Sequence, residues 1–185
     1  MDIDFVITWV DMDDPKWQAE FAKYSGKKEN TKNGVSEARF RDYGFLKYWF
    51  RGVEKFAPWV RKIHFVTSGQ KPDWLDANNP KINLVNHKDY IPNEFLPTYN
   101  SVVIERYIHK IPGLADHFVY FNDDMFLARP VCPEDFFRGG KPVYTALAQP
   151  IFCDANSAFY HMQFSTVSLI NKYFQGRIVI YICGL

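Results

Sequence analysis

The chain has 185 residues, of which 47% are hydrophobic, so its length suits one domain with a substantial core. Its formal net charge is +1, which gives no basic surface for nucleic acid, and no apolar run reaches the roughly 18 residues of a membrane span. The three cysteines follow no metal-binding spacing, and the acidic start at Asp2 and Asp4 argues against a signal peptide, so we expect a cytoplasmic protein.

The first predicted element is a strand from Asp4 to Val10, an apolar run typical of strands buried on both faces of a parallel sheet. The run ends at Asp11, which follows the strand directly and is a candidate ligand-binding residue. Pro15 then opens a predicted helix, for which Asp13 or Asp14 serves as the cap.

A polar segment without periodicity, Lys23 to Ser36, predicts a surface loop before the second helix. Arg39 and Arg41 follow it, and two guanidinium groups can bind a pyrophosphate through forked hydrogen bonds. The alternative is an ordinary surface ion pair with Asp42. A helix is predicted from Tyr43 to Phe56. Its buried stripe consists of the apolar residues at helical spacing, which are Leu46, Trp49, Phe50 and Val53.

Two further strands are predicted from Lys62 to Thr67 and from Lys81 to Asn86, with the start of a short helix at Asp73 to Leu75 between them. The first of these strands ends in a polar turn whose glycine permits close approach of a ligand to the backbone. The candidate binding residues of this turn are Ser68, Gly69 and Gln70. Strands that alternate with helices predict an α/β fold, with a mainly parallel, Rossmann-like sheet flanked by helices.

The next helix is predicted from Val102 to Ile111, and it places Glu105 and His109 four residues apart on one face. Either residue can shuttle a proton, although an exposed pair without a catalytic role is the simpler reading. Three other histidines, His64, His87 and His117, are scattered along the chain, so we expect structural or surface roles for them.

The aromatic run from Phe118 to Phe121 predicts a short buried strand, and three polar residues, Asn122, Asp123 and Asp124, follow it directly. Two neighbouring carboxylates repel each other and need a cation or strong donors to stay ionised. Hard cations such as Mg²⁺ take oxygen ligands of this kind. The segment therefore predicts the metal and phosphate end of an active site, with a simple strand-ending turn as the alternative.

Weaker patterns follow in the last third of the chain. They predict a turn and a short helix from Val131 to Phe136, a strand from Val143 to Leu147 and a helix from Ser165 to Tyr173. An apolar, strand-like tail from Arg177 to Leu185 has no closing polar element.

Two long segments carry a resemblance to a known family. The first is Asp4-Phe-Val-Ile-Thr-Trp-Val-Asp11. The second runs from Arg39-Phe-Arg-Asp42 to Phe121-Asn-Asp-Asp-Met-Phe126 and includes Val66-Thr-Ser-Gly-Gln70. They resemble the first and second signature blocks of the Stealth family of sugar-phosphate transferases, whose members include bacterial capsular polysaccharide phosphotransferases.

The resemblance implies transfer of a sugar-1-phosphate from a UDP-sugar to the hydroxyl of a saccharide acceptor, which forms the phosphodiester links of capsular or surface polysaccharide. It implies a glycosyltransferase A-like sheet, with Mg²⁺ or Mn²⁺ at Asp123 and Asp124 and with Asn122 beside them. Arg39 and Arg41 are then expected to offset the pyrophosphate charge. The residues expected on the nucleotide side are Asp11, Ser68, Gly69 and Gln70.

The same resemblance predicts how the chain is organised. Residues 1–130 are expected to form the nucleotide-sugar-binding core, and residues 131–185 an incomplete C-terminal part of the same catalytic domain. The segment from Gly176 does not continue the third Stealth block, so we expect a chain truncated after the second block. A place at the inner face of the membrane, beside a capsule-synthesis complex, is also implied. The alternatives are a metal-dependent glycosyltransferase and an inactive nucleotide-sugar-binding fragment.

Overall fold

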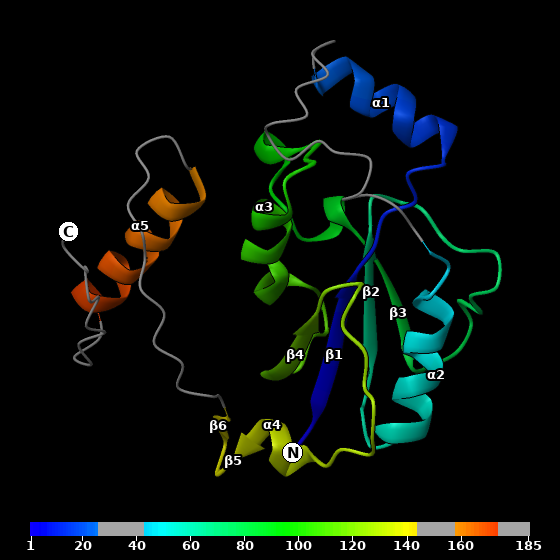
Figure 1. Cartoon of the computed structure of the whole chain (residues 1–185), viewed down its shortest axis with the longest axis vertical. Coiled ribbons are helices and arrows are strands. Elements are labelled where there is room, and N and C mark those ends of the chain that lie inside the picture. Colours follow the sequence, from blue (N-terminus) through cyan, green and yellow to red (C-terminus); the bar gives the residue numbers. More distant parts are fainter. Residues whose placement is uncertain (26–42, 144–157, 174–185) are drawn as a thin grey trace. The chain divides into compact units, whose positions relative to one another are not determined.

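The structure is a computed structural model that describes residues 1–25, 43–143 and 158–173 (Figure 1). The chain divides into two compact units, residues 1–143 and residues 144–185. The first unit contains the sheet and all the predicted site residues that the structure describes. Arg39 and Arg41 lie outside the described residues.

A four-stranded parallel sheet with the order β3-β2-β1-β4 forms the centre of the first unit, which confirms the predicted α/β fold. Its strands are β1 (Ile3–Thr8), β2 (Ile63–Thr67), β3 (Ile82–Asn86) and β4 (His117–Phe121). Successive strands move outward from β1 to β3, and the chain then returns to the other side of β1. The strand order therefore reverses between β1 and β4, where open α/β sheets bind their ligands at the carboxyl ends of the strands.

Both faces of the sheet are covered. Alternate residues of β1 point to opposite faces and so pack in different clusters. Phe5 and Ile7 pack with α2 (Leu46–Phe56), whereas Val6 packs in a second cluster that includes residues of α3 (Ser101–Arg106). Figure 1 shows α2 and α3 on either side of the sheet. The buried stripe of α2 matches the prediction: Leu46, Trp49 and Val53 are buried, and Phe50 packs against the same core.

A buried charged cluster ties β1 to β2 and to the segment before β4. The fully buried Asp4 carboxylate accepts hydrogen bonds from Arg61 Nε at 2.9 Å, from His64 Nε2 at 2.9 Å and from the Ala115 amide at 2.8 Å. Burial alone would raise the pKa of Asp4, but these hydrogen bonds, led by that of Arg61, hold it below the ordinary value of 3.8. Asn83 satisfies the other ring nitrogen of His64, which has the structural role that the sequence predicted.

Two helical predictions need correction. The helix expected from Val102 to Ile111 is interrupted, because α3 ends at Arg106 and a 3₁₀ turn, η4 (Ile108–Lys110), follows it. Residues three apart eclipse each other in a 3₁₀ turn, so Ile108 and Ile111 can both be buried. The helix start expected at Asp73 is a turn, closed by a hydrogen bond from the Leu75 amide to the Pro72 carbonyl.

The end of the first unit contains α4 (Pro133–Phe136), which confirms the predicted short helix, and a hairpin of β5 (Phe137–Arg138) and β6 (Lys141–Pro142). In the second unit, α5 (Ala158–Tyr173) begins earlier than predicted. The strand predicted beyond Val143 and the apolar tail lie outside the described residues. Within the described ranges, no helix has the length and apolar character needed to cross a bilayer.

Candidate active site

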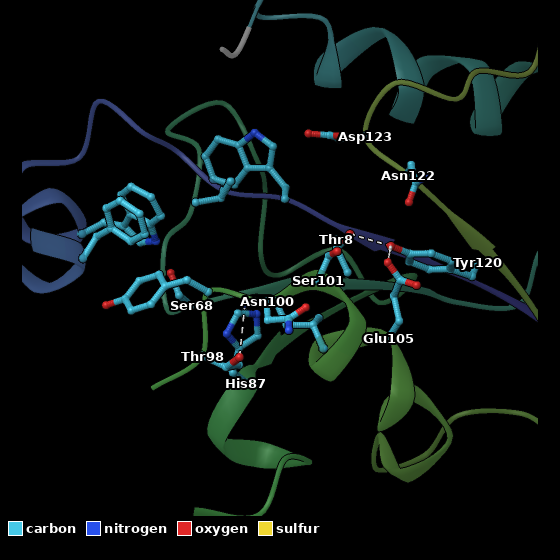
Figure 2. Close-up of a pocket in the computed structure, with 16 residues that line it drawn as sticks. Thr8, Ser68, His87, Thr98, Asn100, Ser101, Glu105, Tyr120, Asn122 and Asp123 are labelled. Atoms are coloured by element: carbon cyan, nitrogen blue, oxygen red, sulfur yellow. Dashed lines mark hydrogen bonds between the residues drawn. The ribbon is translucent and has the colours of Figure 1, made fainter. Parts of the chain in front are cut away.

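A cavity of about 530 Å³ opens at the carboxyl ends of β1 and β4, where the strand order reverses (Figure 2). Thr8 and Trp9 enter it from the end of β1, and Asn122 and Asp123 enter from the end of β4. The start of α3 and the helix α1 (Pro15–Ser25) complete its walls. The short apolar strands thus deliver their first polar residues to one place, as expected for the ligand crevice of this fold.

One end of the cavity is acidic. Asn122, Asp123 and Glu105 line it, and Figure 2 shows the Glu105 carboxylate beside the Tyr120 ring. The Tyr120 hydroxyl donates to Glu105 Oε1 at 3.4 Å, so the Thr8 hydroxyl, 3.1 Å away, is the donor to Tyr120. Burial, together with the neighbouring charges of Glu105 and Asp123, raises the pKa of Tyr120 to about 12, so it remains a donor at neutral pH.

The segment after β4 is both a turn and a cavity wall. The Met125 amide donates to the Asn122 carbonyl at 3.1 Å, which is the strand-ending turn that the sequence left as the alternative. The first two residues of this turn, Asn122 and Asp123, nevertheless line the cavity. Asp124 is exposed and is not among the residues that line it.

The other end of the cavity is neutral and aromatic. Its lining residues include Trp17 and Phe21 from α1, the polar residues Ser68 and Thr98, and His87. Burial lowers the pKa of His87 to about 4, so its imidazole is uncharged at neutral pH. The sequence predicted a structural or surface role for this histidine, and its position after β3 is the signal that could have placed it near the ligand edge.

The opening of α3 is fixed by its own cap. Asn100 Oδ1 accepts from the Val102 amide at 3.0 Å, and the Asn100 amide donates to Thr98 Oγ1 at 3.3 Å. This cap holds Ser101 and Glu105 at the cavity. His109, which the sequence paired with Glu105, lies on the far side of the break after Arg106, is exposed, and does not line the cavity.

Two further predicted binding residues, Gly69 and Gln70, line a second cavity of about 450 Å³ together with residues of α1. Ser68 borders both cavities. Asp11 does not line either one, because its carboxylate accepts a hydrogen bond from the Asp13 amide at 2.9 Å within its own turn. The Gln70 side chain is hydrogen-bonded to the Asp11 backbone and to the Asp14 side chain.

The donor set suits a hard cation that takes part of its ligands from substrate. The amide oxygen of Asn122 and the carboxylates of Asp123 and Glu105 line one end of the cavity, and Mg²⁺ commonly binds one or two carboxylates, with phosphates and water completing its shell. Within the part of the chain that the structure describes, no group of three or more His, Cys, Asp or Glu side chains forms a metal site from protein ligands alone.

Comparison with known families explains which parts of the chain form this cavity. Residues 39–143 match the model of Stealth protein conserved region 2, and residues 1–29 match that of conserved region 1. The chain belongs to the Stealth family. Its cavity is built from both Stealth regions, since Thr8 and Trp17 come from region 1, whereas Glu105 and Asp123 come from region 2.

Three similar proteins are phosphotransferases by name. The chain is 49% identical over 174 residues to the receptor polysaccharide phosphotransferase WefC of Streptococcus oralis, covering 93% of this chain and 52% of the relative. It is 49% identical over 174 residues to the exopolysaccharide phosphotransferase cps2G of Lactiplantibacillus plantarum, covering 94% of this chain and 50% of the relative. For the capsular polysaccharide phosphotransferase WcwK of Streptococcus pneumoniae, the identity is 44% over 174 residues, covering 93% of this chain and 52% of the relative. The chain thus spans about half the length of these relatives.

Proposed function

We propose that this Stealth protein transfers a sugar-1-phosphate from a UDP-sugar to a hydroxyl group of a saccharide acceptor, in the synthesis of capsular or exopolysaccharide. The observation that carries the proposal is that Asn122, Asp123 and Glu105 all line one cavity, which lies at the strand-order reversal. The names of the relatives support the reaction class, and the resemblance to the family supports the UDP-sugar donor. A location at the inner face of the membrane rests on that resemblance alone.

The reaction exchanges one phosphorus–oxygen bond for another. The acceptor oxygen attacks the sugar-bearing phosphorus of the donor, the bond from that phosphorus to the bridging oxygen breaks, and UMP leaves, so the product is a phosphodiester. Asn122 and Asp123 would hold Mg²⁺ or Mn²⁺, which when bound neutralises the charge on the diphosphate. Arg39 and Arg41, outside the described residues, remain predicted partners of the same diphosphate.

Glu105 takes the proton of the acceptor hydroxyl in this proposal. Its carboxylate lies at the cavity and accepts a hydrogen bond of 3.4 Å from the Tyr120 hydroxyl, which in turn accepts from Thr8. A positioned carboxylate acting as general base contributes roughly a hundred- to ten-thousandfold in rate. The proton then passes from Glu105 to solvent, which leaves the carboxylate ready for another turnover.

The direct test is product analysis. The purified protein is incubated with a panel of UDP-sugars, saccharide acceptors and Mg²⁺, and we expect UMP together with a phosphodiester signal in ³¹P NMR. Release of UDP with a glycosidic bond would instead establish the glycosyltransferase alternative. Donor binding without turnover would indicate a nucleotide-sugar-binding fragment.

A matched pair of variants tests the metal role. Asp123→Asn should abolish metal-dependent donor binding in calorimetry, because the substitution removes the charged ligand from the acidic end. Asp13→Asn changes an exposed carboxyl group that does not line either cavity, and should leave binding unchanged. Unaltered metal-dependent affinity in Asp123→Asn would remove this residue from the proposed site.

A further inference from the structure

We infer that Gln70 is a positioning residue that holds α1 in place as a wall of the cavity. The inference builds on the proposed function, since it assigns the same cavity to the substrates. The sequence predicted that Gln70 binds the nucleotide, but its side chain is already occupied. Gln70 Nε2 donates to the Asp11 carbonyl at 2.7 Å and to Asp14 Oδ2 at 3.1 Å, and Gln70 Oε1 accepts from the Asp11 amide at 2.9 Å.

The turn that carries Gln70 is itself anchored to the sheet. Thr67, the last residue of β2, is buried and donates from Oγ1 to the Gln70 carbonyl at 2.8 Å. The Gly69 amide donates back to Thr67 Oγ1 at 3.1 Å. Gly69 has a φ of +104°, and an added Cβ atom would lie 2.9 Å from Asn86 Nδ2, so the turn is packed closely against the end of β3.

The Gln70 amide therefore joins an anchored turn to the start of α1. Asp14 is the cap of this helix, because its Oδ1 accepts from the Lys16 amide at 2.8 Å while its Oδ2 accepts from Gln70. Of the two cap residues that the sequence allowed, the structure thus uses Asp14. Both hydrogen bonds lower the pKa of Asp14, that from Gln70 most strongly, so the carboxylate stays charged at neutral pH.

Farther along α1, aromatic contacts connect the helix to the cavity. Trp17 and Phe21 pack edge-on against Tyr99, with ring centroids 5.6 and 5.0 Å apart, respectively. Trp17 is only 7% exposed and borders both cavities. A shift at the start of α1 would therefore change the neutral end of the cavity, while the acidic end, which β4 and α3 supply, would keep its geometry.

The test is the isosteric substitution Gln70→Glu, which keeps an acceptor for the Asp11 amide but loses both donated hydrogen bonds and places a second carboxylate beside Asp14. We expect hydrogen exchange at the α1 amides to become at least about tenfold faster, with exchange in β1 and β2 unchanged, because hydrogen bonds and charge act locally here. In the active protein, KM for the donor should rise about tenfold while kcat stays within about twofold.

The double variant Gln70→Glu with Asp14→Asn provides the rescue. Asparagine is also a good helix cap, and its amide can donate to the introduced carboxylate, so protection of α1 and the value of KM should return most of the way. Asn93→Ala removes an exposed side-chain amide elsewhere and serves as the control, with no effect expected on either measurement.

Three results would overturn the inference: unchanged exchange in α1, faster exchange throughout the sheet, or a fall in kcat without a rise in KM. Absence of rescue by the double variant would also count against it. If the unsubstituted protein releases no UMP from any donor, the proposed function fails, whereas the exchange measurements on α1 still decide the role of Gln70.

Discussion

Asp4 has the only carboxyl side chain in the described strands, and its replacement by asparagine should strongly destabilise the protein. Asp4 is 0% exposed and its two oxygens accept from the Arg61 guanidinium, the His64 ring and the amides of Lys62 and Ala115. An asparagine keeps one acceptor oxygen. Its amide group would face hydrogen-bond donors where the carboxylate now faces them with a lone pair, and the charge that balances Arg61 would be lost.

The loss in the free energy of unfolding depends on whether each partner of Asp4 can regain hydrogen bonds to water after the substitution. Breaking a buried ion pair by removing one partner costs about 3–5 kcal/mol. The Arg61 side chain is 35% exposed and can regain water, so we expect the lower end of this range, about 3 kcal/mol. His64 is 0% exposed and cannot regain water, so the cost should not fall below that value. With a urea dependence of roughly 2 kcal/mol per molar for a unit of this size, the unfolding midpoint should fall by about 1.5 M urea.

Urea unfolding followed by far-ultraviolet circular dichroism measures this difference. Asp13→Asn is the matched control, because Asp13 is exposed and the change should stay within about 0.5 kcal/mol. A loss below about 1 kcal/mol in Asp4→Asn would refute the reasoning, since it would mean that the carboxylate makes no net contribution beyond that of a neutral amide.

Three further outcomes are expected. Glu105→Gln should lower UMP release roughly a hundredfold or more while calorimetry shows donor affinity within about twofold, and full activity would exclude Glu105 as the base. Gly69→Ala should lower the free energy of unfolding by about 1–3 kcal/mol in urea, because of the φ of +104° and the contact with Asn86, and an unchanged midpoint would contradict the close packing. The pKa of His87 is about 4 in the folded protein against an ordinary 6.5, so the unfolded state binds more protons between these values and stability should fall as the pH drops through that window. The loss between pH 7 and pH 5 should be about 1–2 kcal/mol larger in the unsubstituted protein than in His87→Gln, and equal losses would show that His87 is not buried in this way.

The sheet could be predicted because its strands are short apolar runs bounded by polar residues. The predicted strand that begins at Phe118 starts one residue earlier in the structure, and those that begin at Lys62 and Lys81 start one residue later. The order of the strands could not be predicted, because it depends on long-range packing that no local pattern encodes. The same limit explains the helix break after Arg106, where burial of Ile108 and Ile111 decides the local geometry.

The candidate site was predicted in part for the same reason. Asn122 and Asp123 follow a strand directly, so their position at the ligand edge could be read from the sequence, and both line the cavity. Gln70 also follows a strand, yet its side chain turns to the Asp11 backbone, and only the tertiary structure shows this partner, 59 residues away in sequence. His87 also lines the cavity, after the edge strand β3, and no accompanying motif indicated this position in the sequence.

Two kinds of polar residue, which the sequence alone cannot distinguish, differ in their hydrogen bonding in the structure. The side chains of Asp4, Asp14 and Gln70 each make more than one hydrogen bond to protein partners, and these bonds hold the strands and α1 together. The Glu105 carboxylate has a single long hydrogen bond from Tyr120 in the described structure and lies at an open cavity wall. A carboxylate held this weakly keeps acceptor capacity for a ligand, whereas a saturated one would have to break existing bonds first. The described polar residues of the Stealth regions therefore differ in how far protein partners occupy their hydrogen-bonding groups, and this difference does not follow their distance from the ends of the strands.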